Sequence, residues 1–180
     1  MMAAHFTTIG HSNRNLDDFL AILRAGQVEL VVDVRSFPRS RANPVFNIDT
    51  LPDALARLQI GYRHSPGLGG RRSKQPGVEE HLNARWRVQS FHNYADYALS
   101  TEFDAAFRDL LDLGRFSRLA LMCSEAVWWR CHRRIITDYL IANGHDVEHL
   151  MGAGRIEPAR LTPGARGIAD GKVIYPAEQA

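Results

Sequence analysis

With 180 residues, 45% of them hydrophobic and 23% charged, the chain is long enough for one hydrophobic core and too short for two domains of usual size. A formal net charge of +2 does not by itself indicate nucleic-acid binding, and two cysteines are too few for a disulfide framework, which is typical of a reducing cytoplasm. No apolar run approaches the ~20 residues that span a bilayer, and MMAAHFTTIGHS lacks the pattern of a secretory signal, so we expect a cytoplasmic protein without a membrane partner.

In the first half of the chain, short β-rich runs alternate with helical patterns. Helices are predicted where a capping residue stands three positions before an acidic residue and apolar residues follow at helical spacing, as at Asn15 and again at Thr50. Gly26 is expected to end the first of these helices. Strands are predicted at residues 6–9, 30–34 and 62–64.

The second half resumes this alternation after residues 65–93, the longest irregular stretch, which is rich in glycine, arginine and proline. Thr101, three positions before Asp104, is predicted to cap a third helix. A fourth helix is predicted from about residue 131 to 142, ending before Gly144. Strands are predicted at residues 119–122 and 147–150, with a short edge strand at 173–175.

Strands that alternate with helices imply right-handed crossovers and a parallel sheet covered on both faces. The sequence therefore predicts a single three-layer α/β domain, Rossmann-like, with a mainly parallel sheet of roughly five strands flanked by helices. We assign residues 1–151 to this domain. Residues 152–180 are expected to form an irregular C-terminal tail packed on it.

Polar motifs follow four of the predicted strands at the points where the strands end. In a parallel sheet these ends meet at one edge, where open α/β sheets bind their ligands. We therefore expect four segments that are distant in the sequence to converge on one site. The segments are Gly10 to Asn13, Asp33 to Ser36, Leu68 to Arg72, and Cys123 to Glu125.

A family resemblance rests on the same segments. The chain contains, in this order, the stretches TIGHSN, DVRSFPRS, NPVF, LGGRR, YADY and LMCSE…WRCHRR. Over residues 8–149 it resembles the proteins of domain of unknown function 488, which implies an α/β fold and names no reaction. It departs from the family pattern at Trp128, where proline is frequent, and at His92-Asn93, where an arginine-glycine pair is common.

Both cysteines lie in the motif LMCSEAVWWRCHRR. Cys123 is expected at a strand end just before a helix, where backbone N–H groups and a nearby cation lower a thiol pKa and create a nucleophile; ordinary packing in the core is the alternative. Glu125 is a candidate general acid or base. Cys131 and His132 begin the next helix. Without CxxC or HxxxH spacing no metal ligand is assigned, and a thiol redox pair is a further alternative.

Candidate anion-binding residues lie mainly in the other segments that are expected to converge on the site. His11 and Ser12 precede a helix N-terminus, which attracts anions, and a local cap is the alternative for Ser12. Asp33 is expected to orient a buried guanidinium, that of Arg35 or of Arg133. Guanidinium groups bind phosphate at two points, and no ordinary nucleotide-binding motif is present. Further arginines expected to bind substrate lie in loops: Arg39, Arg71 and Arg72.

The leading hypothesis is a cytoplasmic enzyme that acts on a phosphate-bearing substrate, either a nucleotide or a nucleic acid. Cys123 would be the nucleophile, with Glu125 and His11 transferring protons. The alternative is a non-catalytic module that binds a nucleotide or nucleic acid, and a weaker one is a metal or thiol-redox protein. No cofactor is indicated. Substrate-binding candidates are Ser12, Arg35, Arg39, Arg71, Arg72 and Arg133, supported by Asp33, Cys131 and His132.

Overall fold

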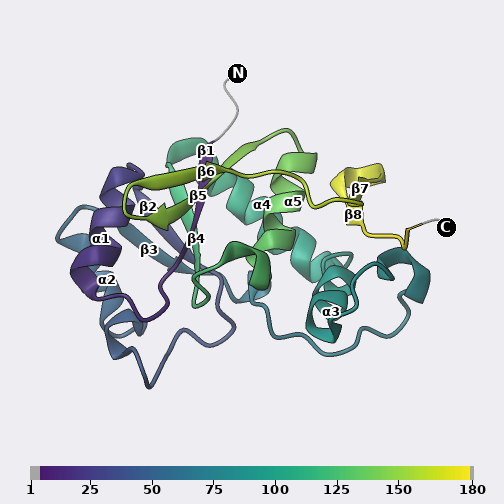
Figure 1. Cartoon of the computed structure of the whole chain (residues 1–180), viewed down its shortest axis with the longest axis horizontal. Helices are drawn as coiled ribbons and strands as arrows, with labels where there is room; N and C mark the ends of the chain where they lie inside the picture. The colour runs from purple at the N-terminus through teal and green to yellow at the C-terminus, as the bar shows by residue number, and fades with distance from the viewer. Residues whose placement is uncertain (1–4, 179–180) are drawn as a thin grey trace.

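A mainly parallel sheet forms the centre of the computed structural model, which describes residues 5–178 (Figure 1). Residues 1–4, part of the segment considered as a secretory signal, and residues 179–180 lie outside the described part. Within it the sheet has six strands in the order β3-β2-β4-β1-β5-β6, all parallel except β6, which is antiparallel to β5. The strands are β1 (His5–Gly10), β2 (Leu30–Asp33), β3 (Gly61–His64), β4 (Leu119–Cys123), β5 (Asp146–Gly152) and β6 (Arg155–Pro158).

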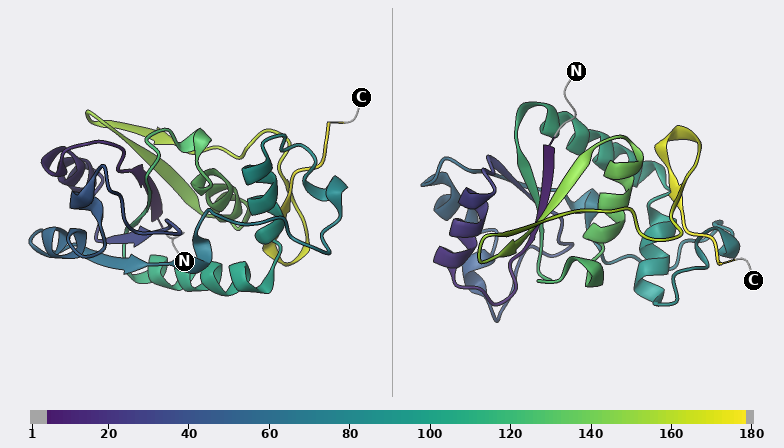
Figure 2. Two further views of the ribbon diagram at one scale, coloured as in Figure 1. Left: turned by 90° about the horizontal axis from the view of Figure 1, so that it is seen from below. Right: turned by 45° about the horizontal axis from the view of Figure 1, so that its top comes forward.

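Helices cover both faces of this sheet, as the views of Figures 1 and 2 show. Helices α1 and α2 bury their apolar residues against one face and α4 and α5 against the other, and α3 packs beside α4 and α5 in the same core. Strand β4 alternates accordingly, with Leu119 and Leu121 in the second core and Ala120 and Met122 in the first. The helices are α1 (Leu16–Ala25), α2 (Leu51–Ala56), α3 (Gln89–Tyr97), α4 (Thr101–Phe116) and α5 (Arg133–Ala142).

Helix starts agree with the predicted caps at one position and differ at two. Asn15 caps α1, because its side chain accepts a hydrogen bond of 2.8 Å from the Asp18 N–H. Thr50 precedes α2 without a side-chain cap. Helix α4 is capped by Ser100 rather than by Thr101, since the Ser100 hydroxyl accepts from the Phe103 N–H at 3.2 Å.

Two elements lie where the sequence predicted irregular structure. Helix α3 falls partly inside residues 65–93 and has no polar capping side chain; Val88 stands at its cap position. Its buried face carries Tyr94 and Tyr97, whose hydroxyls donate to the carbonyls of Leu68 and Gly67. Strand β6 is a largely exposed edge strand inside the tail, which also holds a two-stranded ribbon of β7 (Arg166–Gly167) and β8 (Val173–Ile174). Helix α3 carries Phe91, Tyr94 and Ala95 at helical spacing, but no polar capping residue marks its start, and β6 lacks an apolar run.

This architecture is the predicted three-layer α/β fold with Rossmann-like layering, and its sheet has six strands where about five were expected. Both edges of the sheet are short or polar, which fits a parallel sheet covered by helices. Among residues 5–178, no helix has the length and apolar character required to cross a membrane.

Candidate functional site

Three neighbouring strands end at the same level of the sheet. Gly10 of β1 pairs with Cys123 of β4, and Asp33 of β2 pairs with Met122. The chain continues this alignment beyond the strands, because the His11 N–H donates to the Cys123 carbonyl at 2.9 Å. The expected convergence of segments is therefore present. A cavity of about 430 Å³ opens at this edge, and eight of the predicted site residues line it: His11, Arg35, Arg39, Arg71, Cys123, Glu125, Cys131 and His132.

Two glycines allow the segments to approach this closely. A Cβ atom on Gly10 would lie 1.8 Å from the Glu125 carbonyl oxygen, so the turn after β4 can cross β1 only where no side chain is present. A Cβ atom on Gly70 would lie 2.4 Å from Nδ1 of His132. The loop after β3 is thus in direct contact with the beginning of α5 beside the cavity.

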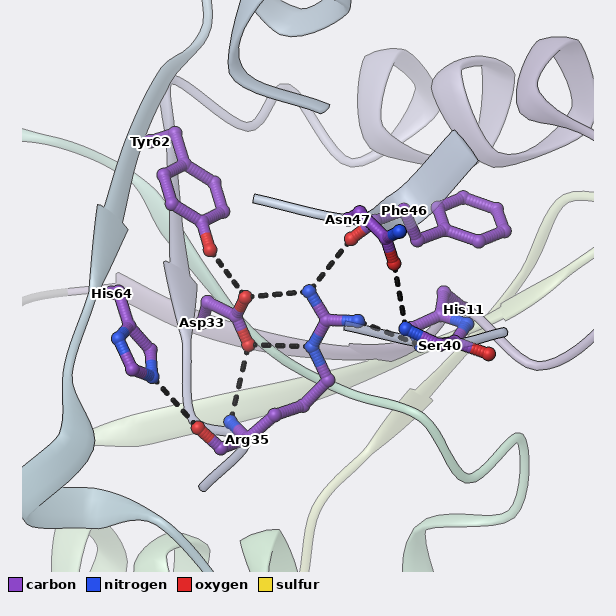
Figure 3. A network of polar contacts seen from close by, with 8 residues as sticks. All are labelled: His11, Asp33, Arg35, Ser40, Phe46, Asn47, Tyr62 and His64. Atoms are coloured by element: carbon purple, nitrogen blue, oxygen red, sulfur yellow. Dashed lines mark hydrogen bonds and ion pairs between the residues drawn. The ribbon is translucent and has the colours of Figure 1, made fainter. Parts of the chain in front are cut away.

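The wall beside β2 is built on a buried ion pair between Asp33 and Arg35 (Figure 3). Arg35 donates from Nε and Nη2 to the two carboxylate oxygens at 2.9 and 2.7 Å, and Nη2 also donates to the Phe46 carbonyl. Tyr62 donates its hydroxyl to the same carboxylate, and burial together with that carboxylate raises the pKa of Tyr62. Of the two arginines considered for Asp33, the partner is Arg35.

His11 fixes the remaining donor of this guanidinium. Its Nδ1 lies 2.8 Å from the Ser12 carbonyl and donates to it, so Nε2 is unprotonated in the neutral ring and accepts from Arg35 Nη1 at 3.2 Å. Burial and the Arg35 charge lower the pKa of His11 and favour this neutral state. The ring stacks on Phe46 at 4.5 Å between centroids. His11 therefore positions Arg35, and its lone pair is already occupied.

The two thiols meet at the floor of the cavity. Cys123 Sγ and Cys131 Sγ lie 2.6 Å apart, and both cysteines are free. Arg133 donates from Nη1 to Cys123 Sγ at 2.6 Å, and its backbone N–H donates to Cys131 Sγ at 3.5 Å. Burial and the hydrogen bond to Cys131 raise the pKa of Cys123 well above its ordinary value. For Cys131, burial opposes the thiolate, but the hydrogen bond shared with Cys123 and the Arg133 charge lower its pKa.

His132 stands beside Cys131 with one ring nitrogen available. Its Nε2 donates to the Val34 carbonyl at 2.8 Å, which leaves Nδ1 unprotonated and 3.5 Å from Cys131 Sγ. Burial lowers the pKa of this imidazole. The ring is thus placed to take the thiol proton of Cys131, a role the sequence did not suggest. Within residues 5–178, no group of three or more His, Cys, Asp or Glu side chains is arranged to hold a metal ion.

The predicted arginines fall into two groups. Arg133 is almost fully buried and donates to the Glu125 and Ala126 carbonyls as well as to Cys123, so it lies beneath the cavity and holds the turn after β4. Arg72 lies outside the lining, because it donates to the Gly69 and Pro66 carbonyls and stacks on Tyr97 at 3.8 Å. Those that line the cavity are Arg35, Arg39 and Arg71.

Arg130 is a fourth arginine of the lining and was not among the predicted site residues, although it lies in the cysteine motif. Arg130 and Arg71 are exposed, and neither forms an ion pair with a carboxylate in the described part of the chain. Arg39 differs, since it pairs with both oxygens of Asp49. Among the described residues, the lining holds four arginines and a single carboxylate, that of Glu125. The cavity therefore carries an excess of positive charge.

Other residues of the lining could not be predicted from the positions where strands end. Ser90 and Phe91 enter from the first turn of α3, the helix that the sequence did not predict. Ser36 and Phe37 follow Arg35 in the loop after β2. Ser12 is not among the lining residues or a helix cap; its N–H donates to the Ser124 carbonyl at 2.9 Å.

Fold and site together define a class of protein: a Rossmann-like α/β domain with an arginine-lined cavity and a thiol pair at the carboxyl edge of its sheet. The chain belongs to the family described as Domain of unknown function DUF488, whose model matches residues 15–140. This confirms the resemblance seen in the sequence. Searches among curated proteins and among solved structures each found no match.

Proposed function

We propose that the chain is a cytoplasmic enzyme that binds a phosphate-bearing substrate, a nucleotide or nucleic acid, in this cavity and attacks it with a thiolate. The observation that carries the proposal is the composition of the lining, in which four arginines and one glutamate surround two adjoining thiols. A reducing compartment such as the cytoplasm would keep both cysteines as thiols.

Arg71 and Arg130 would bind the phosphate, because both guanidinium groups are exposed at the cavity and unpaired with carboxylates in the described residues. Their charge-assisted hydrogen bonds to phosphate oxygens need no existing ion pair to be broken. Arg35 would form the fixed part of the same wall, since Asp33 and His11 hold its guanidinium in one orientation.

Cys131 is the better nucleophile of the pair, in place of Cys123. It accepts the backbone N–H of Arg133 at the start of α5 and has His132 Nδ1 beside it. The thiolate would attack the electrophilic atom of the bound substrate, and the leaving group would take its proton from Glu125, whose exposed side chain lines the cavity.

Binding can be tested with inorganic phosphate, ADP and a short oligothymidylate as probes in calorimetry. We expect affinity that falls as salt rises, and a loss of about tenfold or more for Arg71→Ala or Arg130→Ala, the equivalent of about 1.4 kcal/mol. Arg108→Ala is the matched control, because that exposed arginine pairs with Asp104 on α4. Equal binding by the control and both cavity variants would contradict the proposal.

A second candidate is a non-catalytic module that binds a nucleotide or nucleic acid. Phe37 is 63% exposed and Arg71 lies 5.2 Å from its ring centroid, while Trp129 is 44% exposed next to Arg130. Exposed aromatic rings beside arginines are typical of surfaces that stack on single-stranded bases. Under this alternative, Cys131→Ser binds the ligand as the unaltered chain does and loses no function. Under the enzyme proposal, the same change removes the covalent step.

A further inference from the structure

The thiol pair has a geometry suited to chemistry of its own. Cys123 ends β4 and Cys131 stands two residues before α5, and residues 124–130 connect them in a short turn. Their sulfur atoms are in direct contact, so the two side chains already point toward each other and are placed to form a covalent S–S bond.

The surroundings of the pair favour a thiolate and admit a small reagent. The Arg133 guanidinium contacts Cys123 Sγ, and the Arg133 backbone N–H contacts Cys131 Sγ. A cation and a helix N-terminus both stabilise negative charge on sulfur. Both cysteines line the cavity of about 430 Å³, so a molecule as small as a hydroperoxide can reach them from solvent.

We propose that Cys123 and Cys131 are a reversible oxidation site, at which a hydroperoxide converts the two thiols into an intramolecular disulfide. The Cys131 thiolate attacks one peroxide oxygen, the O–O bond breaks, and the remaining oxygen leaves as an alcohol or water after taking the thiol proton. Cys131 is then a sulfenic acid. Cys123 attacks that sulfur, the S–O bond breaks, and hydroxide leaves with the Cys123 proton as water.

Together, these two reaction steps convert two thiols and one hydroperoxide into one disulfide, one alcohol or water, and one further water. The thiols lose two electrons and two protons, and the peroxide bond is reduced. A dithiol reductant reverses the change. The inference goes beyond the proposed function and needs no bound phosphate, but it has a consequence for that function, because the disulfide removes the nucleophile.

The test treats the full reduced chain with one equivalent of hydrogen peroxide, followed by alkylation under denaturing conditions and mass spectrometry. We expect the loss of two hydrogen atoms, protection of both cysteines and recovery with dithiothreitol. The reaction should be about tenfold or more faster than in the urea-unfolded chain, because the fold holds the sulfurs together. Two alkylatable thiols after treatment, or equal rates in the folded and unfolded chain, would overturn the inference.

Two variants separate the steps. In Cys123→Ser the oxidation is expected to stop at a Cys131 sulfenic acid that dimedone traps, and in Cys131→Ser the remaining thiol is expected to react slowly. Dimedone labelling of Cys123 in place of Cys131 would overturn the order of attack. Phosphate binding measured on the same reduced samples reports on the arginines of the cavity and not on the thiols, so failure of disulfide formation and failure of anion binding are seen separately.

Discussion

Arg133 donates a hydrogen bond from Nη1 to Cys123 Sγ over 2.6 Å while its side chain is almost completely buried. The same guanidinium holds the turn after β4 through the carbonyls of Glu125 and Ala126. A single buried cation thus fixes the loop between the two cysteines and favours negative charge on the pair. The course of this turn and the charge next to the two thiols thus involve the same side chain.

Replacing Arg133 by methionine is expected to slow alkylation of Cys131 at neutral pH. Removal of the cation takes away part of the stabilisation of the thiolate, so the pH midpoint of the reaction moves upward. Iodoacetamide rates measured by mass spectrometry across a pH series give the midpoint. Arg134→Met is the control, since Arg134 donates to Thr162 instead. Arg133→Lys should restore part of the shift, and a midpoint that does not move in Arg133→Met would refute this role.

Asp33→Asn is expected to lower the free energy of unfolding by about 3–5 kcal/mol. The Arg35 guanidinium would remain buried without its carboxylate, and such uncompensated charges are costly. Urea unfolding measures the loss, provided that the slope with denaturant is unchanged. Tyr62→Phe removes one hydrogen bond to the same carboxylate and should cost only about 1 kcal/mol. Similar losses in the two variants would show that the ion pair is not the main contribution.

The sequence predicted the sheet because its strands are short, continuous apolar runs, and the runs also placed polar motifs at their ends. The sequence could not show which side chains contact each other across the site. Asp33 had two candidate arginines, and the choice of Arg35 depends on how the chain turns after β2. The strand end predicts Cys123 as the nucleophile, whereas the contacts of Cys131 on which our proposal rests come from the three-dimensional course of residues 124–133.

Side chains from α3 were missed for a different reason. That helix carries Phe91, Tyr94 and Ala95 at helical spacing, but no polar capping residue marks its start. Its tyrosine hydroxyls donate to the loop carbonyls of Leu68 and Gly67, contacts that the sequence does not reveal. Ser90 and Phe91 reach the cavity only because α3 is there. Arg130 could have been predicted as a site residue, since it lies within the motif that holds both cysteines.

Gly70→Ala is expected to disturb the site from the opposite side. The new Cβ would lie 2.4 Å from His132 Nδ1, so the ring must move and its 2.8 Å bond to the Val34 carbonyl weakens. We expect a loss of about 1–3 kcal/mol in stability and slower labelling of Cys131. Gly167→Ala is the control, because its nearest atom, Ala142 Cβ, is 4.0 Å away. Unchanged Cys131 labelling in Gly70→Ala would argue against a role for His132 at the thiol.

His149 is expected to make the fold sensitive to acid. It lies buried on β5, hydrogen-bonded to Thr8 and stacked on Trp128, and burial together with the Arg133 charge lowers its pKa to about 3. In the unfolded chain the pKa of histidine is about 6.5, so between these values the unfolded state binds more protons. The contribution of His149 is therefore complete above about pH 6.5 and is lost as the pH falls toward 3.

His149→Gln cannot titrate, so its free energy of unfolding should fall less steeply with decreasing pH than that of the unaltered chain. One proton accounts for at most about 1.4 kcal/mol per pH unit. His11 and His132 stay in both proteins and titrate in the same direction, which is why the comparison uses the difference between two slopes. Urea unfolding between about pH 4 and 7 supplies both slopes. Equal slopes for His149→Gln and the unaltered chain would mean that His149 is protonated in the native fold, and that its stacking on Trp128 tolerates the charge.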